Sequence, residues 1–154
     1  MDGTDWRADV EALRAARPRH ILFLCVANAS RSQLAEGLAR SLAPASVKIS
    51  SAGTQPWIVH PTAIEVLEEV GIDASAQRSK SIDEIDLGTV DAVITLCDEE
   101  WCPALPGKYA QRFHWPLTDP TFVSGGPQAQ LDAFRRTRDE LRFRLGILFA
   151  GWNG

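Results

Sequence analysis

Two apolar runs of strand length limit the fold of this chain more than any other feature. HILFLC spans residues 20–25 and VDAVITLC spans residues 90–97, and neither alternates apolar with polar residues as a half-exposed strand would. Continuous apolar runs of this length are typical of strands that are buried on both faces of a parallel sheet. We therefore expect a central sheet that is covered on both sides.

Segments with helical periodicity alternate with the strand-like segments. The sequence predicts strands at 20–25, 47–53, 90–97 and 112–116, and helices at 31–43, 61–70 and 128–149. A capping box formed by Ser81 and Glu84 predicts a further, shorter helix that starts near residue 81. Alternation of this kind predicts an α/β fold in three layers, with a four-stranded parallel sheet between helices. A further helix is expected at 5–17. We therefore divide the chain into an N-terminal helical extension, 1–19, and a catalytic domain, 20–154.

Length and composition exclude several classes of protein. The 154 residues are enough for one domain with a full core, and the sequence holds no apolar run long enough to cross a bilayer. The first twenty residues mix acids with bases and lack the apolar core of a secretory signal, so we expect a cytoplasmic protein. A formal net charge of -4 gives no general attraction to nucleic acid.

The three cysteines are the first candidates for chemistry. Cys25 and Cys97 each end one of the apolar runs, and Cys102 follows shortly after the second. Because ligands bind beyond the carboxyl ends of strands in open parallel sheets, two thiols at that edge indicate a site. A structural zinc site fits poorly, since three cysteines do not supply four soft ligands.

The loop after Cys25 has the composition of an anion-binding loop. Its small residues can curl so that successive N–H groups point at one centre beside a helix N-terminus. Arg31 adds a planar, two-pronged donor for a tetrahedral oxyanion, and Ser32 is placed to hydrogen-bond the sulfur. The predicted oxyanion-binding residues are Val26, Ala27, Asn28, Ala29, Ser30, Arg31 and Ser32. The alternative is that Cys25 is a buried strand-end residue and Arg31 lies on the surface.

These residues resemble a known family. CVANASRS matches the C-x5-R-S signature of the low-molecular-weight protein tyrosine phosphatases, and QLAEGLA, SSAGT, HPTAIEVLEEVGID and the later TDP extend the likeness. Within that superfamily the chain is similar to the arsenate reductases that share the phosphatase fold, because Gln33 follows the signature, SKS stands at 79–81 and TLC stands at 95–97. The resemblance implies a flavodoxin-like, low-molecular-weight phosphatase fold.

The resemblance also implies a redox mechanism without a cofactor. Cys25 attacks arsenate that is held by Arg31 and the loop amides, and Asp119 protonates the departing oxygen. Cys97 then attacks Cys25 and releases arsenite, and Cys102 attacks Cys97 to leave a Cys97–Cys102 disulfide. Thioredoxin is the implied electron donor. The two thiols enclose four residues instead of the six usual in thioredoxin-coupled relatives, which leaves a low-molecular-weight thiol as the other possible donor.

Two other functions stay open at this point. A low-molecular-weight protein tyrosine phosphatase needs only Cys25, Arg31 and Asp119, and Trp57 resembles the aromatic wall that holds a tyrosine ring in such enzymes. A non-catalytic oxyanion-binding regulatory module needs neither a nucleophile nor an acid. Glu36, Asn28 and Ser51 match positions that bind potassium in some reductases, but we predict no metal.

Overall fold

Four parallel strands form the predicted sheet in the computed structural model, which describes residues 5–97 and 111–152. The strands are β1 (His20–Cys25), β2 (Lys48–Gly53), β3 (Ala92–Cys97) and β4 (Gln111–Leu117). They pair in the order β2-β1-β3-β4, and every pairing is parallel. The prediction of a four-stranded parallel sheet is confirmed, and each strand end lies within two residues of its predicted position.

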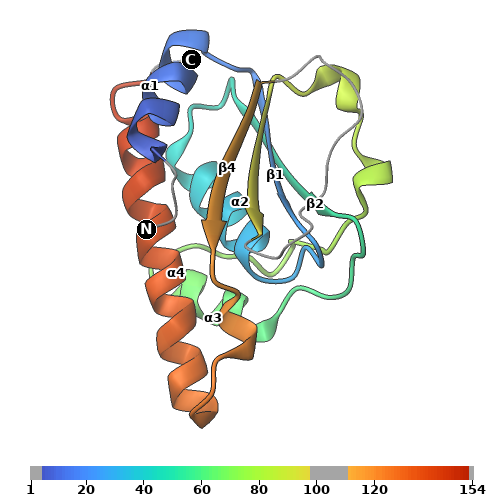
Figure 1. The fold of residues 1–154 in the computed structure, drawn as a ribbon, viewed down its shortest axis with the longest axis vertical. Helices are drawn as coiled ribbons and strands as arrows, with labels where there is room; N and C mark the ends of the chain where they lie inside the picture. The colour runs from blue at the N-terminus through green and yellow to red at the C-terminus, as the bar shows by residue number, and fades with distance from the viewer. Residues whose placement is uncertain (1–4, 98–110, 153–154) are drawn as a thin grey trace.

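The α-helices share one face of this sheet (Figure 1). They are α1 (Trp6–Ala16), α2 (Arg31–Leu42), α3 (Pro61–Glu68) and α4 (Gly126–Phe149). The opposite face is covered by two 3-10 helices, η1 (Ile82–Glu84) and η2 (Leu87–Thr89), and a third, η3 (Pro120–Phe122), follows β4. The capping box at Ser81 and Glu84 is present, but it begins one 3-10 turn instead of an α-helix.

Strand β1 shows why its apolar run is uninterrupted. Ile21 and Phe23 point into the core that the α-helices cover, whereas Leu22 and Leu24 point into the core beneath the 3-10 helices. All four side chains have an exposed fraction of 0%. Burying each of them stabilises the fold by about 1.5–3 kcal/mol, so one polar substitution in this strand would be severe.

The N-terminal helix is tied to the main domain by specific contacts. The Trp115 indole Nε1 on β4 donates to Asp9 Oδ2 at 3.0 Å, and the Arg14 guanidinium donates to the Leu148 carbonyl oxygen at 2.8 Å near the end of α4. Helix α1 thus packs on α4 and contacts Trp115 of β4. The division at residue 19 stays a prediction.

The strands all run in the same direction, and their carboxyl ends point towards the bottom of Figure 1. Helices α2 and α4 begin from the connections at that end, so loops and helix N-termini gather there. None of the helices in the described ranges has the length and apolarity of a membrane-spanning segment.

Candidate active site

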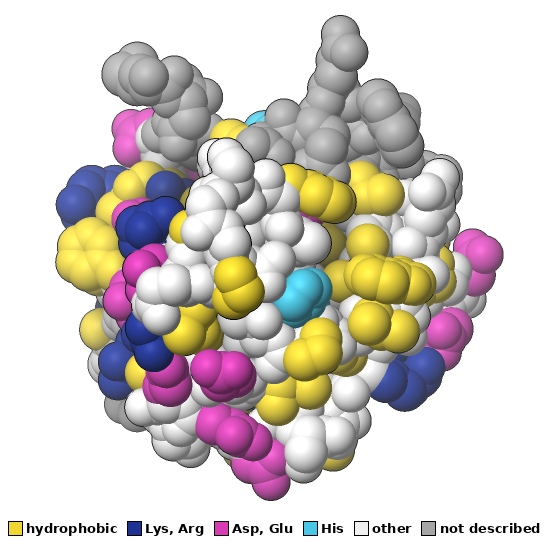
Figure 2. Space-filling model, turned by 90° about the horizontal axis from the view of Figure 1, so that it is seen from below, with side chains coloured by type: hydrophobic (Ala, Val, Ile, Leu, Met, Phe, Trp, Pro, Cys, Tyr) yellow, Lys and Arg dark blue, Asp and Glu magenta, His cyan; other side chains and the backbone are white. Residues whose placement is uncertain are grey.

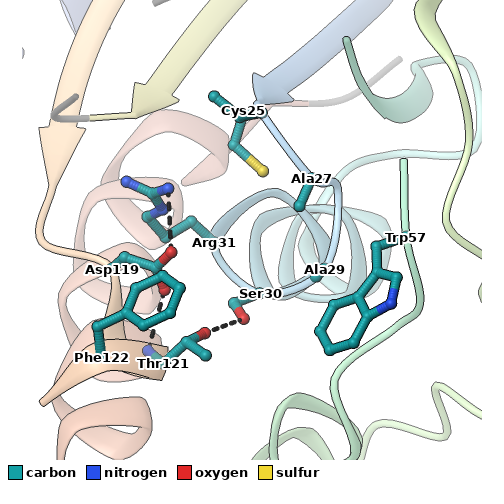
Figure 3. Close-up of a pocket in the computed structure, with 10 residues that line it drawn as sticks. Cys25, Ala27, Ala29, Ser30, Arg31, Trp57, Asp119, Thr121 and Phe122 are labelled. Atoms are coloured by element: carbon teal, nitrogen blue, oxygen red, sulfur yellow. Dashed lines mark hydrogen bonds and ion pairs between the residues drawn. The ribbon is translucent and has the colours of Figure 1, made fainter. Parts of the chain in front are cut away.

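Cys25 lies at the end of β1, at the bottom of a small cavity. The exposed fraction of the residue is 2%, and its thiol is free. The cavity has a volume of about 210 Å³, which is below the roughly 300–1,000 Å³ of clefts for drug-sized ligands. Figure 3 shows the sulfur pointing into the space between Arg31 on one side and Trp57 on the other. The site is therefore shaped for a small ion beside a nucleophile.

The loop between β1 and α2 turns its carbonyl groups outward. The carbonyl oxygens of Val26, Ala27 and Ala29 accept hydrogen bonds of 2.9, 3.1 and 2.9 Å from backbone N–H groups in the segment 55–60. In a planar trans peptide the N–H points opposite to the C=O, so the amides of this loop face the cavity. An inward ring of amides attracts anions. This geometry supports the predicted oxyanion-binding loop.

Two residues allow the loop to curl so tightly. Asn28 has a φ of 48°, in the left-handed region that asparagine tolerates better than most residues. Gly53, at the end of β2, lies directly against the loop, and a Cβ at this position would collide with the Val26 carbonyl oxygen. The glycine of the SSAGT segment is therefore required by the close approach of strand and loop.

The side chain of Asn28 has a fixed orientation. Its Oδ1 accepts a hydrogen bond of 2.8 Å from the Lys80 backbone N–H, which can only donate. The amide nitrogen Nδ2 must therefore face the other way, where it donates to Ser32 Oγ at 2.7 Å and to Ser51 Oγ at 3.0 Å. Both hydrogens of the amide are thereby used.

Asn28 donates to two serine hydroxyls, and these in turn contact Glu36 and Cys25. Ser51 Oγ donates to Glu36 Oε1 at 2.5 Å, because an ionised carboxylate only accepts. Ser32 Oγ accepts from Asn28 and lies 2.8 Å from Cys25 Sγ, so its own proton is available to the sulfur. An ionised sulfur can only accept, so the serine is the donor in the thiolate form. The network thus places a hydroxyl where it can support Cys25 as a nucleophile.

Glu36 anchors this network inside the protein. Its side chain is 1% exposed, and its charge is met by Lys80 Nζ at 3.2 Å and by Arg40 at 2.7 Å. The Lys80 side chain is 13% exposed, whereas that of Arg40 is 53% exposed. An ammonium group therefore lies beside this buried carboxylate. In the described ranges, no three His, Cys, Asp or Glu side chains gather as metal ligands.

Arg31 and Asp119 meet at the edge of the cavity. Arg31 is the first residue of α2 and is 3% exposed, and its guanidinium donates to the Leu117 carbonyl oxygen at 3.0 Å. It also lies 3.4 Å from Asp119 Oδ2. The other carboxyl oxygen of Asp119 accepts from the Thr121 backbone N–H at 2.9 Å. The structure thus excludes the alternative that Arg31 is a surface residue.

Aromatic and aliphatic side chains surround the mouth of the cavity. The exposed fractions of Trp57, Ile58 and Phe122 are 66%, 45% and 82%. Figure 2 shows hydrophobic side chains gathered around a histidine on the face at the carboxyl ends of the strands. His60 caps α3 and packs at a tilt against the ring of Phe134, and burial lowers the pKa of its imidazole, an effect that Asp119 partly opposes.

Known proteins with the same arrangement decide the family. A family model described as low molecular weight phosphotyrosine protein phosphatase matches residues 20–151. The chain belongs to this family.

An arsenate reductase of Halalkalibacterium halodurans is 39% identical over 81% of this chain and 91% of its own length. A glutaredoxin arsenate reductase of Synechocystis is 36% identical over 86% and 97%. A solved structure titled "An arsenate reductase in the phosphate binding state" has a TM-score of 0.73 and 35% identity, and covers 86% of this chain and 98% of its own.

Most of the predicted site residues lie around this phosphatase-type cavity. Its lining includes Cys25, Val26, Ala27, Ala29, Ser30, Arg31 and Asp119. Asn28 and Ser32 lie behind the loop, where each is 0% exposed and acts through hydrogen bonds. The roles assigned to these residues stay predictions.

The two remaining cysteines are placed differently. Cys97 ends β3, the strand next to β1, with Leu24 opposite Thr95 in the register. Cys25 and Cys97 therefore lie at the carboxyl ends of two neighbouring strands. Cys97 is 0% exposed and is disulfide-bonded. Cys102 lies outside the described residues.

Three residues of the site were missed in the sequence. Thr121 and Phe122 belong to the cavity lining and immediately follow Asp119–Pro120, so their closeness to the acid was a usable signal. Lys80 lies 44 positions from Glu36, and no local spacing connects them. Only the folded chain brings that pair together.

Proposed function

We propose that this chain is an arsenate reductase that uses Cys25 as its nucleophile and a cysteine relay as its source of electrons. The observation that carries the proposal is a free, buried Cys25 whose sulfur lies 2.8 Å from Ser32 Oγ and faces a cavity lined by Arg31 and Asp119. Relatives that are named arsenate reductases span nearly the whole domain at up to 39% identity.

The first step joins sulfur to arsenic. Arsenate enters the cavity with its oxygens on the loop amides and on the Arg31 guanidinium, and the Cys25 thiolate attacks the arsenic atom. One hydroxyl group of the arsenate takes a proton from Asp119 and leaves as water. The product is a Cys25 adduct in which arsenic is still pentavalent. Donors that are already in place stabilise the charge that develops on the remaining oxygens.

The second step transfers two electrons. The Cys97 thiolate attacks Cys25 Sγ, a sulfur–sulfur bond forms, and the sulfur–arsenic bond breaks with its electron pair on arsenic, which leaves as arsenite. Cys102 then attacks Cys97 and frees the Cys25 thiolate. Such exchange needs an aligned incoming thiol. The placement of Cys25 and Cys97 at the carboxyl ends of neighbouring strands supports this step.

An external dithiol protein or small thiol closes the cycle by reducing the Cys97–Cys102 disulfide. The chain carries only three cysteines, so after one turnover it holds no thiol pair that could reduce this bond. Thioredoxin, glutaredoxin and a low-molecular-weight thiol are the candidate donors.

Hydrolysis of aryl phosphates is a second candidate function. Trp57 and Phe122 line the cavity from opposite sides of its mouth, as Figure 3 shows. Arsenate is too small to need such walls, whereas a flat aryl group attached to a tetrahedral anion would lie between them. Cys25, Arg31 and Asp119 suffice for this reaction.

One pair of assays separates the two functions. The purified protein and its Cys97→Ser variant are compared for arsenite formation with a thiol donor and for cleavage of p-nitrophenyl phosphate. We expect Cys97→Ser to abolish arsenite formation and to change phosphate-ester cleavage less than about twofold. A wild-type protein that cleaves the ester well and forms no arsenite contradicts the reductase. Equal loss of both activities contradicts the relay.

A further inference from the structure

The serine that begins α2 has an unusual hydrogen-bond partner. A serine at this position commonly accepts a hydrogen bond from an N–H of the first helical turn. The Ser30 side chain makes no such bond. Its Oγ lies 3.0 Å from Thr121 Oγ1 in η3, across 91 positions of sequence, and the exposed fraction of Ser30 is 4%. Figure 3 shows this contact crossing from the oxyanion loop to the segment that carries Asp119.

Thr121 is directly coupled to the carboxyl group of Asp119. Its backbone N–H donates to Asp119 Oδ1 at 2.9 Å, and its carbonyl oxygen accepts from Gln130 Nε2 of α4 at 3.0 Å. Movement of Thr121 would therefore move Asp119 as well. The described contacts from the start of α2 to this segment run through Ser30 and through Arg31, which touches Leu117 and Asp119.

The contacts of Arg31 with Leu117 and Asp119 depend on its charge. An oxyanion in the cavity would compete for these guanidinium donors, because a tetrahedral anion offers stronger, two-pronged acceptors. An Asp119 that carries the proton needed for the first step would no longer attract Arg31 as an ion. The contact between Ser30 and Thr121 joins two neutral hydroxyls, so it depends on neither charge.

The geometry points to Ser30 and Thr121 as positioning residues, whose hydroxyl–hydroxyl contact holds Asp119 over the cavity when an oxyanion occupies Arg31. This inference rests on the proposed function, since it assigns Asp119 as the acid of the first step. It concerns the placement of the acid and not the binding of the anion. The expected effect is therefore on kcat, with KM for arsenate nearly unchanged.

The kinetic test uses Ser30→Ala and Thr121→Val in single-turnover reactions of the reduced full chain with arsenate. Loss of one neutral hydrogen bond should lower the rate of free-thiol loss about three- to tenfold. The double variant should lose no more than either single variant, and Thr121→Ser, which keeps the hydroxyl, should retain the wild-type rate. Ser41→Ala on the same helix and Thr137→Val on α4 are matched controls, because their hydroxyls bond only to carbonyls of their own helices.

Epistasis with the acid separates positioning from a general structural role. In an Asp119→Asn background no acid remains to be placed, so Ser30→Ala should cause no further loss of rate. An equal fold-loss in both backgrounds overturns the inference, and so does a loss confined to KM.

A second readout is independent of turnover. Hydrogen–deuterium exchange is measured over residues 117–122 with saturating inorganic phosphate as the probe anion. Ser30→Ala should raise exchange of the Thr121 amide at least threefold with phosphate bound, and Ser41→Ala should not. Unchanged exchange overturns the inference even if the chain reduces arsenate. If arsenate does not oxidise the wild-type thiols but Ser30→Ala raises exchange of the Thr121 amide as expected, the proposed function fails and the positioning contact stands.

Discussion

Cys25 Sγ lies 2.8 Å from Ser32 Oγ, and Asn28 Nδ2 donates to the same serine oxygen from behind. The sulfur at the end of β1 thus has on its protein side a hydroxyl that donates to it when it is ionised, and on the other side an open cavity. The nucleophile and the serine belong to a single strand–loop–helix unit, which Lys80 and the segment 55–60 hold in place through hydrogen bonds.

Removing the hydroxyl of Ser32 should make Cys25 less reactive. In Ser32→Ala, the thiolate loses a hydrogen bond to a charged atom, and we expect its alkylation by iodoacetamide at pH 7 to slow about tenfold. Peptide mass spectrometry follows the Cys25 peptide separately from the other cysteines. Ser41→Ala is the control on the same helix. An unchanged alkylation rate would show that Ser32 does not support the thiolate.

Lys80 and Arg40, the two cations that pair with Glu36, should contribute unequally to the free energy of unfolding. Lys80→Met leaves a buried carboxylate with only the exposed Arg40 beside it, and we expect a loss of about 1–3 kcal/mol in the free energy of unfolding. Arg40→Met should cost less than about 1 kcal/mol, because exposed ion pairs contribute little. Urea unfolding measures both.

A double variant checks the cause of that loss. Glu36→Gln removes the buried charge, so combining it with Lys80→Met should restore part of the stability lost in Lys80→Met alone. Equal destabilisation by Lys80→Met and Arg40→Met would instead mean that the buried position of the ammonium group does not matter.

The stability that the ion pairs between α3 and α4 contribute to the fold should depend on pH. Glu69, at the end of α3, accepts from Arg135 and Arg138 of α4 at 2.6 Å each, and the hydrogen bond from Arg135 is the main cause that lowers its pKa to about 2. A carboxyl group with a lowered folded-state pKa stabilises the fold fully above its unfolded-state value of about 4.5, and this contribution is lost as the pH falls towards 2.

Calorimetry tests this dependence. Glu69→Gln should have a lower Tm than the wild type at pH 7, and the difference should narrow steadily between pH 4.5 and pH 2.5. A difference that stays constant over this range would show that ionisation of Glu69 does not contribute to the connection.

The strands and the central helix could be predicted because their signals are local. HILFLC is buried on both faces, and the leucines of α2 recur at helical spacing, so β1 and α2 were found with ends within one residue of the structure. Helix α4 begins at Gly126, two residues before its predicted start, because Gly125–Gly126–Pro127 has the composition of a loop.

Contacts between distant segments could not be predicted in the same way. Periodicity shows that a helix has an apolar side, but it does not show which face of a sheet that side will cover. All four α-helices share one face, and the 3-10 turns at 82–89 suffice for the other because Ile82, Ile85 and Leu87 supply the apolar cover. The contact between Ser30 and Thr121 likewise depends on the position of the loop that follows β4.

The most direct test of the account is a single turnover of the fully reduced protein with arsenate, followed by mass spectrometry of its cysteines. We expect one arsenite and the loss of two thiols per chain, with the final disulfide between Cys97 and Cys102 and a free Cys25. In Cys97→Ser we expect no arsenite and no disulfide. Arsenite formed by Cys97→Ser at the wild-type rate, or a wild-type protein that keeps all three thiols, would contradict the cysteine relay.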